Sequence, residues 1–187
     1  MARADDMIDD VIRGRGDMSM FMLILQGLVE RDCIGLGWDP VVVELGVRSG
    51  NSTLAILNAL HRINRGRLYS VDIEPCEAAH SMVMEAGLYN RWYFKLGESV
   101  SFADDVAECD IVFIDTSHEY EQTIREIAAW EKRIRANGRM IFHDTLSTDG
   151  VRWAIDDFME VSHRKWRRDN IDVGPGLCVL TRSPTVV

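Results

Sequence analysis

The chain has 187 residues, of which 47% are hydrophobic and 27% charged, a balance typical of a globular protein and not of a disordered chain. Its formal net charge of -9 argues against a nucleic-acid partner, because neutralising phosphates requires a positive surface, and favours a small-molecule substrate. The four cysteines lie far apart without a CxxC pair, which excludes a zinc knuckle and a disulfide framework and indicates a cytoplasmic location.

Residues 1–38 predict a short acidic helix followed by an apolar one that begins near Met18. Several aspartates stand among the first ten residues, where a signal peptide would be basic, so we expect no export signal. The apolar stretch 18–29 is interrupted by polar residues and is too short to cross a bilayer, so no membrane association is expected. Its methionines suit packing on a sheet, with a homodimer contact as the alternative.

Residues 41–53, VVVELGVRSGNST, predict a strand, a tight glycine turn and a helix capped by its Asn-Ser-Thr. In an open α/β sheet, such a turn lies at the carboxyl edge, where a nucleotide-like ligand enters. Gly46 and Gly50 allow close backbone approach, and the amides around Ser52 can hold an anionic group. The GxxxG spacing after Glu44 differs from the dinucleotide fingerprint GxGxxG, which argues against an NAD-dependent oxidoreductase.

A helix is predicted over residues 54–63, followed by a strand over 68–73 that ends on Asp72 and Ile73. A carboxylate at this place can accept hydrogen bonds from both hydroxyls of a ribose. The alternative is that Asp72 caps the helix that follows. The sequence therefore predicts a cofactor contact, a cap, or both roles for Asp72.

A second helical segment is predicted over residues 76–86, and a third strand over 92–96. Gly97 and Ser99 follow that strand at the edge where the cofactor is expected. Ordinary turn chemistry also explains a Gly-x-Ser at a strand end, so both interpretations stay open.

The stretch 110–120, DIVFIDTSHEY, carries the strongest indication of chemistry. A continuous apolar run bounded by aspartates is typical of a strand that is buried on both faces of a parallel sheet. Asp115 stands at its carboxyl end. The helix after it is predicted to end in a C-cap near residues 137–138, which are Asn-Gly.

The stretch 110–120 carries a carboxylate, Asp115, and an imidazole, His118, at its strand end. The next strand, predicted over residues 139–145, likewise ends on an imidazole and a carboxylate, His143 and Asp144. Strands joined by a crossover helix usually lie side by side, so the two ends should converge. A single histidine or aspartate would be explained as structural, whereas two such strand ends indicate a functional cluster. Its expected members are Asp115, His118, His143 and Asp144.

The remaining chain predicts a helix over residues 151–161 and two strands, 166–173 and 177–182, joined by Gly-Pro-Gly. Such a closing antiparallel hairpin is not typical of a dinucleotide-binding domain. The pattern as a whole predicts an α/β fold with a mostly parallel seven-stranded sheet.

The run ELGVRSGNST resembles the first motif of class I S-adenosylmethionine-dependent methyltransferases, in which the turn wraps the methionine part of the cofactor. The run 110–145 is similar to the group that includes cephalosporin-hydroxylase-like and sugar or macrolide O-methyltransferases, relatives of the catechol-type metal-dependent enzymes. The likeness covers about residues 41–145. It implies one methyltransferase domain over 1–187, with a helical cap (1–38) on a three-layer, Rossmann-like core (39–187).

The resemblance also implies roles for individual residues. In the catechol-type relatives, an aspartate after the fourth strand and an Asp-Asn pair after the fifth hold a divalent metal, and a lysine serves as the general base. By position, Asp115 and Asp144 would hold Mg²⁺ and His118 would replace the lysine, while Thr145 stands at the asparagine. The implied cofactor-binding residues are Glu44, Gly46, Gly50, Ser52, Asp72, Ile73, Gly97, Ser99 and Asp115.

The expected reaction is transfer of the sulfonium methyl group to an oxygen of a sugar, macrolide or phenol-like molecule. His118, or a metal held by Asp115 and Asp144, would remove the acceptor's proton, and His143 would orient Asp144 or contact the substrate. The alternatives are a non-catalytic module that binds S-adenosylmethionine or a partner, and an NAD-dependent oxidoreductase.

Overall fold

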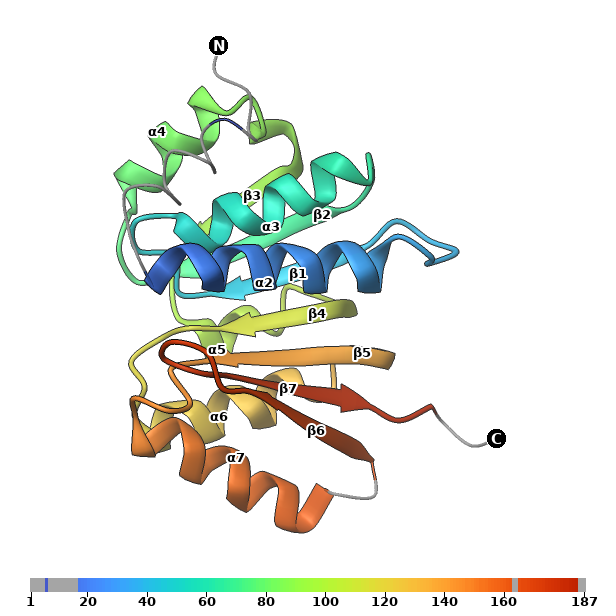
Figure 1. Cartoon of the computed structure of the whole chain (residues 1–187), viewed down its shortest axis with the longest axis vertical. Helices are drawn as coiled ribbons and strands as arrows, with labels where there is room; N and C mark the ends of the chain where they lie inside the picture. The colour runs from blue at the N-terminus through green and yellow to red at the C-terminus, as the bar shows by residue number, and fades with distance from the viewer. Residues whose placement is uncertain (1–5, 7–16, 163–164, 185–187) are drawn as a thin grey trace.

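The computed structural model describes residue 6 and residues 17–162 and 165–184. The acidic helix predicted before Met18 lies outside this part of the chain. The described residues form a seven-stranded sheet of order β3-β2-β1-β4-β5-β7-β6 (Figure 1). The strands are β1 (Val41–Leu45), β2 (Arg67–Asp72), β3 (Trp92–Leu96), β4 (Cys109–Ile114), β5 (Ile134–His143), β6 (Trp166–Ile171) and β7 (Leu177–Arg182). The helices are α2 (Asp17–Cys33), α3 (Asn51–Arg62), α4 (Glu77–Glu85), the 3-10 turn η1 (Tyr89–Arg91), α5 (Ser99–Phe102), α6 (Tyr120–Trp130) and α7 (Asp149–Ser162).

Strands β1 to β5 are parallel to one another, whereas β7 pairs antiparallel with both β5 and β6. The order reverses after β3, because β4 returns to the free side of β1. Loops after β1 and β4 therefore meet at one edge of the sheet (Figure 1). This arrangement confirms the predicted mostly parallel sheet with a closing antiparallel hairpin.

Alternating strand residues separate two apolar cores, one on each face of the sheet. In β1, Val42 packs with α2, α3 and α4, while Val43 and Leu45 pack with α5, α6 and α7. This alternation follows from the two-residue period of a strand. Figure 1 shows α2 beside α3 over one face. The result is the predicted three-layer α/β/α arrangement.

Helix α2 packs on the sheet through one apolar side. Phe21, Met22, Leu25 and Val29 are buried in the core of that face. This is the packing role that the sequence favoured for the methionine-rich segment. Within the described residues, none of the helices combines the length and the apolar character that a membrane span requires.

The predicted end of the helix after β4 is wrong. The sequence pattern extends that helix to residues 137–138, but α6 ends at Trp130 and β5 begins at Ile134. Ile134 is buried and pairs with Cys109 of β4. Because Trp130 and Ile134 are four positions apart, the helical apolar spacing continues across the turn, and periodicity alone does not reveal the boundary.

Candidate active site

The glycine turn after β1 is fixed by its neighbours on both sides. Gly46 has a φ of 88°, and a Cβ added there would lie 2.1 Å from the carbonyl oxygen of Asp115. Gly50 has a φ of 85°, and its added Cβ would lie 2.6 Å from the Cβ of Ala79 on α4. Gly50 is itself the N-cap of α3, with no side-chain capping bond, so the predicted Asn-Ser-Thr cap is wrong. Both positions require the backbone freedom and small size of glycine.

A cavity of about 510 Å³ opens where this turn meets the ends of β2 and β4. Its wall also contains Arg48, Glu98, Thr116 and Gln122, which the sequence did not single out. Six residues that the sequence predicted for the cofactor line this cavity: Gly46, Asp72, Ile73, Gly97, Ser99 and Asp115. Its size suits a small-molecule ligand.

Asp72 holds the glycine turn against the end of β2. Its Oδ2 accepts hydrogen bonds from the backbone N–H groups of Val47 at 2.8 Å and Arg48 at 3.0 Å, and its Oδ1 accepts from Glu74 at 2.9 Å. Burial opposes ionisation of this carboxyl, but the backbone hydrogen bonds outweigh it and lower the pKa of Asp72. The N-cap of α4 is Cys76, so the alternative role of Asp72 as that cap is wrong.

Three predicted cofactor residues do not line the cavity. Gly50 and Ser52 lie at the start of α3, and Ser52 is buried. Glu44 is fully buried in β1 and accepts hydrogen bonds from Thr53 Oγ1 at 2.8 Å and Ser70 Oγ at 2.7 Å. Burial raises the pKa of Glu44 to about 7, against the effect of its hydroxyl donors. Glu44 therefore ties α3 to β2 beneath the turn.

A second buried carboxylate, Glu126 of α6, supports another part of the cavity wall. It accepts hydrogen bonds from Thr116 Oγ1 at 3.0 Å, Gln122 Nε2 at 2.9 Å and Ser99 Oγ at 2.5 Å. Burial raises the pKa of Glu126, although these donors oppose the shift. The sequence carries no clear indication of this role, because a single glutamate on an amphipathic helix is usually solvent-exposed.

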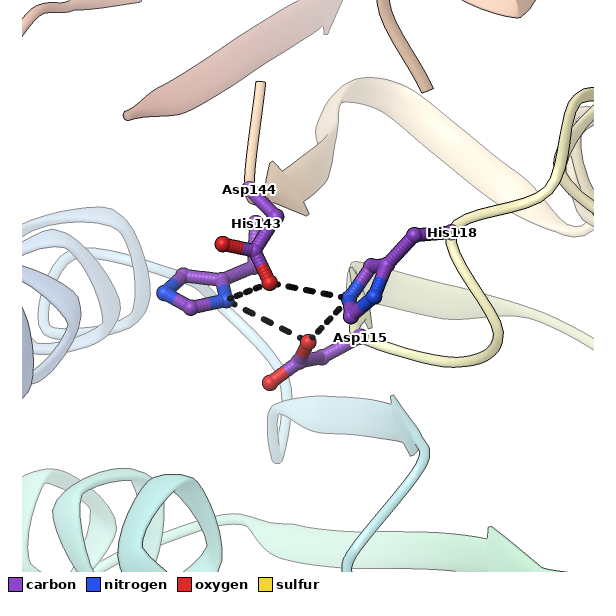
Figure 2. A group of neighbouring side chains, drawn as sticks. All are labelled: Asp115, His118, His143 and Asp144. Atoms are coloured by element: carbon purple, nitrogen blue, oxygen red, sulfur yellow. Dashed lines mark hydrogen bonds and ion pairs between the residues drawn. The ribbon is translucent and has the colours of Figure 1, made fainter. Parts of the chain in front are cut away.

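The four residues predicted for the functional cluster meet after the ends of β4 and β5 (Figure 2). Of the four, Asp115 also lines the cavity. His118 Nε2 lies 2.9 Å from Asp115 Oδ1 and 3.0 Å from Asp144 Oδ2. His143 Nδ1 lies 3.2 Å from each of the same two oxygens. Two nitrogens and two oxygens therefore converge on one point.

The charges of the cluster are strongly coupled. Burial opposes ionisation of Asp115, but hydrogen bonds from both histidines outweigh it and bring its pKa to about 2. Burial likewise opposes a charged His143, but hydrogen bonds to Asp115 and Asp144 raise its pKa to about 9. The hydrogen bond to Asp115 also raises the pKa of His118, and that from His143 lowers the pKa of Asp144. Each carboxylate and imidazole thus favours the charged form of its partner.

Backbone strain helps to aim two of these side chains. His118 has a φ of 60° and Asp144 a φ of 58°, both in the left-handed region that non-glycine residues rarely adopt. The start of helix α7 packs closely against the loop that carries His118, since a Cβ added to Gly150 would lie 2.6 Å from the carbonyl oxygen of His118. The His143 ring is buried and lies 4.3 Å from the ring of Phe21.

Comparison with known proteins agrees with this fold. A family model described as a methyltransferase domain matches residues 43–145, more than half of the chain. The chain belongs to the class I S-adenosylmethionine-dependent methyltransferases. The methyltransferase match spans the glycine turn, Asp72 and all four residues of the cluster. No curated protein sequence matches the chain at a significant level.

Solved methyltransferase structures share the fold. The O-methyltransferase TomG from Streptomyces achromogenes, involved in tomaymycin synthesis and solved with S-adenosylmethionine, has a TM-score of 0.73 at 18% identity, covering 88% of this chain and 80% of its own. An O-methyltransferase from Bacillus cereus, solved with S-adenosylhomocysteine, has a TM-score of 0.72 at 18% identity, covering 88% and 81%. A methyltransferase from Geobacter sulfurreducens has a TM-score of 0.74 at 18% identity, covering 96% and 88%.

Proposed function

We propose that this methyltransferase transfers the methyl group of S-adenosylmethionine to a hydroxyl oxygen of a small molecule. One observation carries the proposal: Asp115 belongs both to the wall of the cavity and to the cluster of carboxylates and imidazoles. A methyl donor in the cavity would therefore lie beside groups that can prepare an acceptor oxygen.

The cavity suits the nucleoside part of the donor. Asp72 is favoured in its ionised form at the cavity wall, where a carboxylate can accept hydrogen bonds from a ribose diol. Ile73 and Leu96 are exposed apolar side chains at the ends of β2 and β3, and Ile73 lines the cavity. Apolar surface of this kind supports contact with an adenine ring.

The acceptor side supports transfer to oxygen. Methyl transfer from a sulfonium needs an aligned nucleophile whose proton is removed, and the chain supplies charged groups for that purpose at the cavity edge. The His118 side chain is 29% exposed and so can be reached by a ligand. From the resemblance of residues 110–145, we propose a sugar, macrolide or phenol-like acceptor.

The first experiment is calorimetric titration with S-adenosylmethionine, S-adenosylhomocysteine and NAD, followed by mass spectrometry of a panel of sugars, macrolides and phenols after incubation with the methyl donor. We expect binding of S-adenosylhomocysteine, no binding of NAD, and one added methyl group on an oxygen of an acceptor. Binding of NAD alone would refute the proposal. Cofactor binding with no product from any acceptor would favour the non-catalytic module.

A further inference from the structure

We propose that Asp115, His118, His143 and Asp144 together bind one divalent transition-metal ion, such as Zn²⁺ or Co²⁺, in preference to Mg²⁺. Both histidines are ligands in this site, so His118 is not the free base that its position in the sequence suggests. The binding of the ion follows from the cluster alone. Its part in the reaction rests on the proposed function.

The spacing of the four atoms suits a metal ion. Around the cluster, nitrogen and oxygen alternate, with edges of 2.9, 3.0, 3.2 and 3.2 Å, and none of the four atoms lies more than 4.8 Å from another. Metal–ligand bonds of about 2.1 Å place adjacent ligands of an octahedral ion about 3.0 Å apart, and those of a tetrahedral ion about 3.4 Å apart. The edges match adjacent positions of an octahedral ion, which leaves further positions open.

Ordinary hydrogen bonding explains this arrangement less well. A ring nitrogen carries at most one hydrogen, which points well toward one acceptor. Here each ring aims a single nitrogen at both carboxylates, and each carboxylate presents a single oxygen to both rings (Figure 2). Once the rings give up the protons at these nitrogens, two nitrogens and two oxygens face one point, as the ligands of a cation do.

The donor set does not fit the Mg²⁺ implied by the resemblance. Mg²⁺ prefers oxygen ligands and keeps several waters, whereas imidazole suits transition-metal ions. Thr145 stands where the relatives have an amide ligand, but its Oγ1 is turned to the hairpin loop, 2.8 Å from a Cβ added at Gly176. The described cluster therefore offers two imidazole nitrogens where a magnesium site would have oxygens.

This site changes the expected route of proton removal. With its Nε2 turned to the ion, His118 has no lone pair at that atom for the acceptor's proton. A bound ion would instead lower the pKa of an acceptor hydroxyl that reaches it, and the proton would leave to water. The new O–CH₃ bond then forms as the S–CH₃ bond breaks, which leaves neutral S-adenosylhomocysteine.

The test uses the full chain, freed of metal with a chelator and then titrated with Zn²⁺ and Mg²⁺ by calorimetry, and with Co²⁺ by visible absorption. No methyl donor or acceptor is present. We expect one transition-metal ion per chain, bound at least a hundredfold more tightly than Mg²⁺, with Co²⁺ bands that report nitrogen ligands.

His118→Ala and Asp144→Asn should each weaken transition-metal binding at least tenfold, while His61→Ala, at an exposed site on α3, should not change it. Thermal melting and S-adenosylhomocysteine binding of each variant verify its fold. Equal affinity for Mg²⁺ and Zn²⁺, unchanged binding by His118→Ala, or no binding at all would overturn the proposal.

Activity assays separate this proposal from the proposed function. Metal binding without any methylated product would leave the site intact and contradict O-methyl transfer. Methyl transfer at full rate in the presence of the chelator would support the proposed function and contradict a part for the ion in the reaction.

Discussion

The buried carboxyl of Glu44 should make the stability of the protein depend on pH. Burial raises its pKa from 4.5 to about 7 in the folded state, so the folded protein holds a proton that the unfolded chain has released. The stabilisation is complete below the unfolded pKa and is lost as pH rises through the folded pKa. A shift of this size corresponds to about 3 kcal/mol, of which about 2.5 kcal/mol falls between pH 5 and pH 8.

Replacing Glu44 with glutamine should remove that dependence. The amide oxygen can still accept from Thr53 and Ser70, while the amide nitrogen takes the place of Oε1, which has no hydrogen-bond partner among the described residues. A buried unpartnered N–H costs about 1–3 kcal/mol, but this cost does not change with pH. The stability difference between variant and wild type should therefore shift in favour of the variant by about 2.5 kcal/mol from pH 5 to pH 8.

Urea unfolding of both proteins at pH 5, 6, 7 and 8 measures this difference, since other titrating groups contribute equally to both. Glu85→Gln, at an exposed site on α4, controls for the loss of one carboxylate. A difference between Glu44→Gln and wild type that stays constant over this range would refute the argument that Glu44 is protonated in the folded state.

Three further predictions concern the cavity and the cluster. Gly46→Ala should abolish measurable S-adenosylhomocysteine binding and lower the melting temperature, because its Cβ would meet the carbonyl oxygen of Asp115; unchanged calorimetric affinity would contradict the described turn. Asp72→Asn should weaken cofactor binding at least tenfold and destabilise the fold by about 1–3 kcal/mol, as an amide cannot accept all three backbone hydrogen bonds; urea unfolding and calorimetry measure both effects. His118→Ala should lower turnover at least a hundredfold with little change in cofactor affinity, because His118 does not line the cavity; equal losses in both would show a structural role.

The sequence predicted the fold well because most of its strands can be recognised from local sequence patterns. A β-branched run followed by two glycines, and apolar runs ending in acids, require only the two-residue period and the rule for crossover connections. The boundary between α6 and β5 was missed because Trp130 and Ile134 satisfy helical spacing while lying in different elements. Ile134 belongs to the strand because it pairs with Cys109 of β4, a residue from another part of the chain.

The site was predicted in part for a related reason. Topology brings strand ends together, so Asp115, His118, His143 and Asp144 could be grouped from the sequence alone. The sequence could not show which of the predicted cofactor residues line the cavity, because burial is a property of the packed chain. Glu44 carried the family motif yet lies beneath the turn, while Glu126 carried no motif yet supports the wall.

Asp115 links the two halves of the site mechanically as well as chemically. Its backbone N–H donates to the carbonyl of Leu45 at 2.9 Å, its carbonyl oxygen leaves no room for a side chain at Gly46, and its carboxylate meets both histidines. A displacement of the end of β4 would therefore move the glycine turn and the cluster together. Because packed structure resists such strain, we expect the end of β4 to hold the cavity wall and the cluster at a fixed distance from each other. That rigidity suits a reaction whose rate depends chiefly on alignment.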